Sequence, residues 1–382
     1  MARLLLLERE LSILWQLGYP NCNETEAKIS LKMKVGKSMF SKTKMQKIVG
    51  IDIQKNCIRY CTQKGGKFIY GELVINGTIF KDDKLRQAES LVSAFREISK
   101  RLKMQSFNVV LTALNSRLLI RQIPLGNMKT EKEIREYIYL ELGESISLPF
   151  ENPIFDVLIL EPSKNKKPQQ SRKTKGKKQA GQSMVIQRNR FAVNGKVPVI
   201  VTSEPILIEL GDVLQKAGLK LVGVDCSALA YTRICHKQIN WTENFVLVEL
   251  DAGVANITFF EELVPTYTQY EDYNQVNWKF METEQTVQVD FRESTEIEAL
   301  KKLATTTNDL IQYFLQDLSP DCDLAKIYVV GGHPLLKKEV IDLFAARIDL
   351  PVKSLSPRVN EKMKKRLPNR FLLAAGLASK EV

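Results

Sequence analysis

The feature that most constrains the fold of this chain is a pattern that occurs twice: three short strand-like segments followed by a helix-like segment. The first copy has apolar segments within residues 48–75, separated by turn-forming residues, and then a helical apolar periodicity over 85–102. The second copy has three such segments within 245–270 and a long helical periodicity over 296–318. No evident sequence repetition relates the copies. We therefore predict an α/β fold with two related halves.

A different pattern lies between the two copies. Thr130 and Glu133 have the spacing of a capping box at the start of a helix, and strand patterns at 154–160 and 197–201 flank a lysine-rich stretch. Ser203 is expected to cap a further helix that ends at Gly218. We predict a small subdomain in which the lysine-rich stretch forms a disordered basic loop at 163–193 between two strands.

The net charge of +12 is concentrated in two runs of the sequence. Residues 28–47 contain seven lysines and no acid, and residues 163–183 contain seven lysines, one arginine and no acid. Removing these 15 positive charges from the total of +12 leaves −3, so the rest of the chain gives no reason to expect specific nucleic-acid binding. We expect residues 1–46 to form a flexible basic leader. The loop at 164–178 is either a solvated linker or a contact for anionic lipids.

Composition excludes several classes of protein and site. No apolar run approaches the ~20 residues that cross a bilayer, and the N-terminal segment lacks the apolar region of a secretory signal. The six cysteines form no CxxC pair, and only two histidines are present, so neither a zinc site nor a disulfide framework is supported. We expect a cytoplasmic protein with reduced, mostly buried thiols, in which Cys57 and Cys61 pack in the core.

Three short motifs occupy related places in the two predicted halves. Asp52 ends the first strand of the first half, Asp251 ends the first strand of the second half, and Gly331-Gly332 follows a buried strand. Paired carboxylates suit a hard cation such as Mg²⁺, and glycine lets the backbone approach a bound group closely. Each motif alone is also common as an ordinary turn.

In order and spacing these motifs resemble the phosphate 1, phosphate 2 and adenosine motifs of the actin-like ATPases. Residues 123–160, 197–230, 247–270 and 327–357 further resemble the PilM family, the FtsA-like proteins of type IV pilus assembly, and the resemblance covers about 47–379. It implies an actin-like α/β fold of two related halves, with a small α/β subdomain over 124–217 inserted in the first half and a nucleotide cleft between the halves. The implied domains are 47–243 and 244–382, the second ending in a closing helix at 371–379.

The resemblance implies that the cleft binds ATP and Mg²⁺, with Asp52 and Asp251 holding the metal. The residues that it assigns to the nucleotide site are Asp52, Gln54, Lys55, Asn56, Cys57, Arg59, Asp251, Gly253, Val254, Ala255, Asn256, Gly331, Gly332 and His333. Gln54 replaces a glycine of the family pattern, and Arg59 replaces a lysine. Two interpretations follow: Lys55 and Arg59 add positive charge to a phosphate pocket, or the pocket is degenerate and the protein is a scaffold.

The resemblance implies a cytoplasmic adaptor, peripheral to the inner face of the cell membrane, that docks the cytoplasmic tail of a PilN-like protein. Pilus, competence pseudopilus and secretion systems all remain candidates, and the motor ATPase, the platform proteins and an anionic membrane surface are further potential partners. No residue is recognisable as a water-activating base, so at most weak ATPase activity is expected. The alternatives are an ATP-dependent small-molecule kinase and an FtsA-like cell-division filament protein.

Overall fold

The structure is a computed structural model. It describes residues 47–75, 77, 79–81, 84–142, 144, 146–158, 195–274, 278–283, 287–336, 338–356 and 367–380. The predicted leader at 1–46 and the predicted basic loop at 163–193 lie outside these residues. Within the described part of the chain, no helix is both long enough and apolar enough to span a membrane.

The first half is built on a five-stranded sheet with the order β10-β6-β1-β2-β3. Its strands are β1 (Ile48–Ile53), β2 (Cys57–Lys64), β3 (Lys67–Val74), β6 (Asn108–Thr112) and β10 (Lys220–Asp225). The first three are antiparallel, and β6 and β10 run parallel to β1. Helices α3 (Ala88–Leu102) and α5 (Glu204–Lys216) pack their apolar faces on this sheet. The two-residue strands β4 (Phe80–Lys81) and β5 (Lys84–Leu85) precede α3.

The second half repeats this arrangement in a sheet with the order β13-β12-β11-β16-β17. Its strands are β11 (Asn244–Asp251), β12 (Val254–Glu261), β13 (Val264–Asp272), β16 (Leu324–Val330) and β17 (Val352–Ser354). Again three antiparallel strands are followed by two parallel ones. Helices α7 (Glu293–Tyr313) and α8 (Lys338–Ala345) cover it, and a π-helical turn at Phe314–Leu318 follows α7. The predicted relation between the halves is therefore visible in their common strand order.

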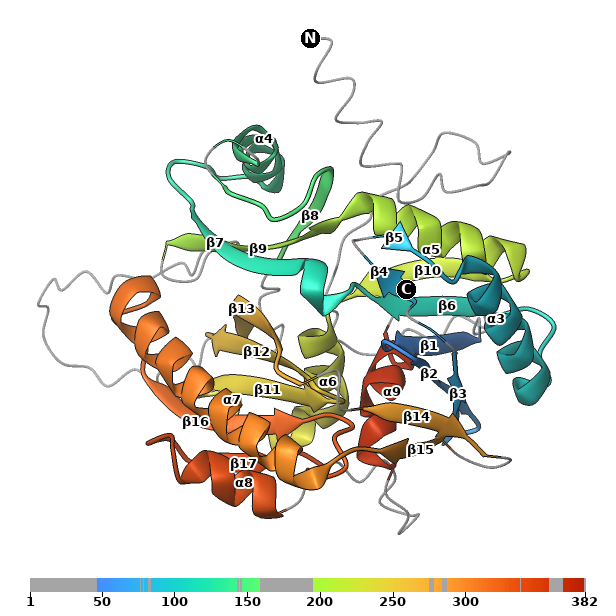
Figure 1. Cartoon of the computed structure of the whole chain (residues 1–382). Coiled ribbons are helices and arrows are strands. Elements are labelled where there is room, and N and C mark those ends of the chain that lie inside the picture. The colour runs from blue at the N-terminus through green and yellow to red at the C-terminus, as the bar shows by residue number, and fades with distance from the viewer. Residues whose placement is uncertain are drawn as a thin grey trace, which may run out of the picture.

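A third layer contains β7 (Leu118–Pro124), β8 (Pro153–Val157), β9 (Lys196–Ser203) and α4 (Glu131–Glu141). The strands form the sheet β7-β9-β8, and Figure 1 shows α4 beside it at the periphery of the molecule. The capping box of Thr130 and Glu133 is present as predicted. Ser203 is the N-cap residue of α5, as predicted, although its side chain makes no capping hydrogen bond.

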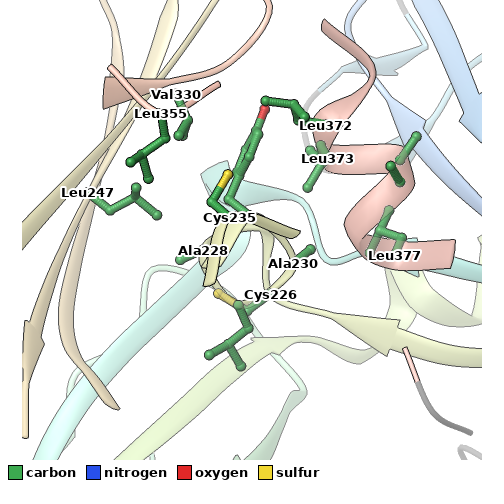
Figure 2. Close-up of a cluster of buried hydrophobic side chains, with 14 of the residues drawn as sticks. Cys226, Ala228, Ala230, Cys235, Leu247, Val330, Leu355, Leu372, Leu373 and Leu377 are labelled. Carbon is green, nitrogen blue, oxygen red and sulfur yellow. The ribbon is translucent and has the colours of Figure 1, made fainter. Parts of the chain in front are cut away.

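Helices α6 (Ser227–Cys235) and α9 (Leu372–Ala378) lie in the core between the two large sheets. Figure 2 shows Leu372, Leu373 and Leu377 of α9 near Ala230 of α6, with Leu247 of the second sheet on the other side. The helices touch at Gly376, where a methyl group would lie 2.1 Å from the carbonyl oxygen of Ala230. The last helix of the chain thus packs against the first half.

The remaining pair of strands, β14 (Lys279–Glu282) and β15 (Val287–Asp290), joins the second half to the first. Although both strands follow β13 in the chain, they lie beside β3 of the first half (Figure 1). Short 3-10 turns occur at Asn115–Arg117, His236–Gln238 and Asn369–Phe371. The sequence patterns had not indicated β14 and β15, because neither strand is longer than four residues.

Candidate nucleotide cleft

The predicted motifs of the two halves meet where β1 and β11 end, and an arginine lies between them. Strand pairing places Arg59 of β2 opposite Asp52 of β1, which directs both side chains to the same face of the sheet. Arg59 donates two hydrogen bonds to Asp251, with Nη1–Oδ2 and Nη2–Oδ1 distances of 2.5 and 3.1 Å. Its Nη1 atom also lies 3.7 Å from Oδ2 of Asp52. The two predicted metal ligands therefore share one guanidinium.

The charges of this cluster are set by burial and by the guanidinium. Burial alone would raise the pKa of Asp251, but the charge of Arg59 and its hydrogen bonds lower that pKa below its ordinary value. For Asp52 burial dominates, and it raises the pKa to about 7 although Arg59 and Gln54 both act in the opposite direction. Oδ2 of Asp52 is buried and has no hydrogen-bond partner. Asp251 is thus the carboxylate that Arg59 neutralises most directly.

Two residues that were not predicted from the sequence extend the cluster. Glu72 of β3 lies opposite Arg59 in the register, and its Oε2 atom is 3.9 Å from Nε of Arg59. Oε1 of Glu72 forms an ion pair with Nη2 of Arg370 at 2.9 Å and accepts a hydrogen bond from the backbone N–H of Val287 at 3.2 Å. Counting residues along the predicted hairpin of 58–62 and 68–75 would have placed Glu72 beside Arg59. No sequence signal pointed to Arg370.

The glycine pair approaches this ion pair directly. Gly331 has a φ of +119°, and a methyl group there would lie 2.0 Å from the carbonyl oxygen of Leu250. At Gly332 a methyl group would lie 2.9 Å from both Nη1 of Arg59 and Oδ2 of Asp251. Glycine is required at both positions because protein atoms already fill the space that a side chain would need.

His333 lies beside the glycines in a separate buried cluster. Its Nδ1 accepts the backbone N–H of Leu335 at 3.1 Å, so Nε2 carries the proton and donates to Oε1 of Glu296 at 3.0 Å. The other carboxylate oxygen of Glu296 accepts hydrogen bonds from the side chains of Asn274 and Trp278. The rings of Trp278 and His333 are 5.2 Å apart. With both ring nitrogens bonded within the fold, His333 acts here as a structural residue.

The other predicted residues of the first hairpin have different environments. Gln54 donates from Nε2 to Oδ1 of Asp52 at 2.7 Å, whereas the side chain of Lys55 is exposed. Cys57 is buried, and its thiol pKa is raised to about 12, mainly by burial. Oδ1 of Asn56 is buried without a hydrogen-bond partner. Lys55 therefore adds no charge inside the cleft.

In the second hairpin, between β11 and β12, most of the predicted site residues also bond to other groups of the protein. Gly253 has a φ of +70°, and its carbonyl oxygen accepts the backbone N–H groups of Tyr273 and Asn274. Val254 and Ala255 are paired with strands on both sides. The amide of Asn256 bonds to Glu249, Thr258 and Thr268 in a buried network that does not include Asp52. Burial raises the pKa of Glu249 to about 7.

The residues present do not fit a magnesium nucleotide in this arrangement. The cavity at the cluster has a volume of about 90 Å³, and Arg59, Trp278 and Gly332 are among the residues that line it. Pockets for small molecules usually measure roughly 300–1,000 Å³, so this space suits a few water molecules. The carboxylates proposed for the metal are already paired with Arg59. Among the described residues, no group of three or more metal-binding side chains is present.

Comparison with known proteins places this geometry in a wider context. No protein-family model and no curated protein matches the sequence. Among solved structures, PilM in the PilM-PilN type IV pilus biogenesis complex superposes with a TM-score of 0.62 at 14% identity, covering 87% of this chain and 97% of that one. The chain has the actin-like fold. The predicted resemblance to PilM is confirmed as a likeness in fold.

Two other solved structures have lower similarity. The ethanolamine utilization protein EutJ from Carboxydothermus hydrogenoformans has a TM-score of 0.45 at 14% identity, covering 86% of this chain and 88% of that one. MreB5 of Spiroplasma citri, solved with bound ADP, has a TM-score of 0.42 at 12% identity, covering 87% and 95%.

Proposed function

We propose that the protein is a cytoplasmic adaptor of a type IV pilus, competence pseudopilus or related secretion machine, and that it docks the cytoplasmic tail of a PilN-like membrane protein. The observation that carries the proposal is the likeness in fold to PilM, which extends over 97% of the PilM chain in its complex with PilN. In this role the protein lies at the inner face of the cell membrane. The motor ATPase and the platform proteins are the expected further partners.

We propose the outer face of α4 as the docking surface for the tail. Tyr137 and Leu140 lie three residues apart on this helix and are 37% and 59% exposed. The opposite side of α4 is occupied, because Ile134 and Ile138 are buried against the sheet β7-β9-β8. An exposed aromatic and leucine pair of this kind suits a short apolar segment of a partner.

Charge gives the expected chemistry of that partner. Residues 129–151 contain six glutamates against two lysines and one arginine. Arg135 is paired with Glu131 and Asp156, so its charge is already neutralised within the fold. Cytoplasmic segments next to a membrane span carry an excess of lysine and arginine. The surface around Tyr137 and Leu140 therefore suits a tail with apolar residues beside basic ones.

The proposal is tested by titrating the candidate partner's cytoplasmic tail, as a synthetic peptide, into the purified protein in a calorimeter. Leu140→Ser and Tyr137→Ser are expected to weaken binding about tenfold each, because each removes about 1.4 kcal/mol or more of apolar contact. Raising the salt concentration should also weaken binding, since it screens the glutamates.

The matched control is Tyr313→Ser, which changes a tyrosine that is 45% exposed on α7. It should leave the affinity unchanged. Undetectable binding of the tail at high micromolar concentration would count against the adaptor role. Equal weakening by the control would show that α4 is not the docking surface.

A further inference from the structure

We propose that Arg59 takes the place of the metal and phosphates in the cleft, so that the protein holds its two halves together with its own charges and does not bind ATP. This inference concerns the cleft and not α4, so its tests do not depend on whether a partner tail docks on α4. It follows from three sets of contacts: the carboxylates around Arg59, the groups that fill the cleft, and the strands that cross it.

Three carboxylates, contributed by both halves, surround the guanidinium of Arg59. Asp52 and Glu72 come from the first half and Asp251 from the second, and all three lie within 3.9 Å of guanidinium nitrogens. Asp52 and Glu72 are 1% and 8% exposed, so both carboxyl groups are largely removed from water. Buried like charges repel unless a cation lies between them. The guanidinium supplies that cation permanently, because its charge does not titrate in the physiological range.

Apart from the cavity of about 90 Å³, protein atoms occupy the space around the ion pair. The backbone of Gly332 lies against Arg59 and Asp251 so closely that a methyl group would be 2.9 Å from each. Next to it, the ring of Trp278 stacks on Phe291 with centroids 4.4 Å apart. Trp278 also donates to Glu296 at 3.1 Å, which fixes the indole in place. A nucleotide would have to displace this packing and break the Arg59–Asp251 pair together.

The strands β14 and β15 add contacts across the cleft. Arg101 of α3 donates to Oε1 of Glu282 at 2.9 Å, and the backbone N–H of Val74 donates to Oε2 of the same carboxylate at 3.3 Å. Val287 of β15 donates its backbone N–H to Glu72. The second half therefore contacts β3 and α3 at the outside of the cleft. Within the cleft, Arg59 binds Asp251. These contacts join the two halves through groups of the protein itself.

The first test needs no variant. The melting temperature of the purified chain is measured with millimolar Mg-ATP, with Mg-ADP and without nucleotide. A ligand that binds only the folded state raises the melting temperature, so the proposal expects no shift beyond about 1 °C. A rise of several degrees that disappears in Asp251→Ala would overturn it.

The second test removes the internal cation. Arg59→Ala leaves three carboxylates facing one another, so its melting temperature should fall by roughly 5 °C or more, and Mg²⁺ alone should restore part of the loss. Arg59→Lys retains the charge and should lose less, which also provides a variant that folds if Arg59→Ala does not. Arg233→Ala is the control, because Arg233 is paired with the single carboxylate of Asp225, which Lys380 also neutralises.

Mg²⁺ should therefore not restore the stability of Arg233→Ala. The proposal is overturned if Arg59→Ala melts at the wild-type temperature, or if Mg²⁺ stabilises it no more than it stabilises the control.

Discussion

Gly50 of β1 and Ala374 of α9 are in direct backbone contact: a methyl group at position 50 would lie 2.1 Å from the carbonyl oxygen of Ala374. The same methyl group would be 2.5 Å from the backbone nitrogen of Ala378. The last helix of the described residues, α9, therefore packs directly on their first strand, β1. Only glycine permits this approach, because neither the central strand nor the helix backbone can move without disturbing the core.

Gly50→Ala is therefore expected to lower the free energy of unfolding by about 3 kcal/mol, at the upper end of the usual cost of overpacking. Urea denaturation of the variant and the wild type measures the difference. The control is Gly126→Ala, at a turn glycine with a φ of +56° and no atom within 4 Å of the added methyl group. That change should cost about 1 kcal/mol through backbone strain alone. A loss for Gly50→Ala no larger than the control's would contradict the contact.

The start of α4 depends on a reciprocal pair of hydrogen bonds. The backbone N–H of Glu133 donates to Oγ1 of Thr130 at 3.2 Å, and Oε2 of Glu133 accepts the backbone N–H groups of Lys129 and Thr130. Thr130→Ala is expected to reduce the free energy of unfolding by about 1 kcal/mol, measured by urea denaturation. Thr130→Ser keeps the acceptor oxygen and should be close to the wild type. Equal losses of unfolding free energy in the two variants would mean that the hydrogen bond to the hydroxyl of Thr130 does not stabilise the fold.

The same cap predicts a dependence on pH. The backbone hydrogen bonds from Lys129 and Thr130 lower the pKa of Glu133 below its ordinary value. A carboxylate whose pKa is lowered by folding stabilises the fold above the unfolded pKa, and this contribution is lost as pH falls through the folded pKa. The stability difference between wild type and Glu133→Gln should therefore be larger at pH 7 than at pH 3. A difference that is the same at both pH values would refute this assignment.

Five of the six cysteines are buried in the described structure and form no disulfide: Cys57, Cys61, Cys226, Cys235 and Cys322. Burial raises the pKa of each of these thiols to about 12. Because the thiolate is the reactive form, we expect these five to react with a thiol reagent at pH 8 at least about a hundredfold more slowly than in denaturant. Fast reaction of more than one thiol in the native protein would contradict this.

The raised thiol pKa values also set the sign of an alkaline effect. Unfolded thiols lose their protons near pH 9, whereas the folded ones keep them to about pH 12. In this range the unfolded chain binds fewer protons, so the free energy of unfolding falls as pH rises. Cys235→Ala should reduce that fall by roughly 1 kcal/mol between pH 8 and pH 10. Denaturation curves at the two pH values measure it, and an unchanged slope would count against burial of this thiol.

The lysine-rich residues 164–178 lead to a prediction from the sequence alone. They contain seven lysines and one arginine and no large apolar side chain, so they offer almost no apolar surface to bury. Their deletion should leave the melting temperature within about 1 °C of the wild type. If they contact lipid, the deletion should weaken sedimentation with anionic vesicles, and neutral vesicles serve as the control. A large fall in melting temperature would show that they support the fold.

The sequence alone determined the elements whose signals are local. Apolar alternation between turns predicted β1 to β3 and β11 to β13, and Thr130 with Glu133 predicted where α4 begins. Gly218, with a φ of +77°, ends α5 where the sequence placed the stop. The resemblance predicted the actin-like fold, which the structure has. These signals succeed because strand alternation, helix capping and positive φ depend on residues within a few positions of one another.

The state of the cleft was decided only by the tertiary structure. From the sequence, Arg59 could serve a phosphate or a carboxylate equally well, and both interpretations remained open. The fold brings Asp251 to it from 192 positions away, and it brings Arg370 and the strands β14 and β15 to the same place. Ser203 shows the same limit, since it lies at the N-cap of α5 and yet its side chain makes no capping hydrogen bond. The partner of a buried arginine depends on which distant segments of the chain fold against it, and no local sequence pattern determines those segments.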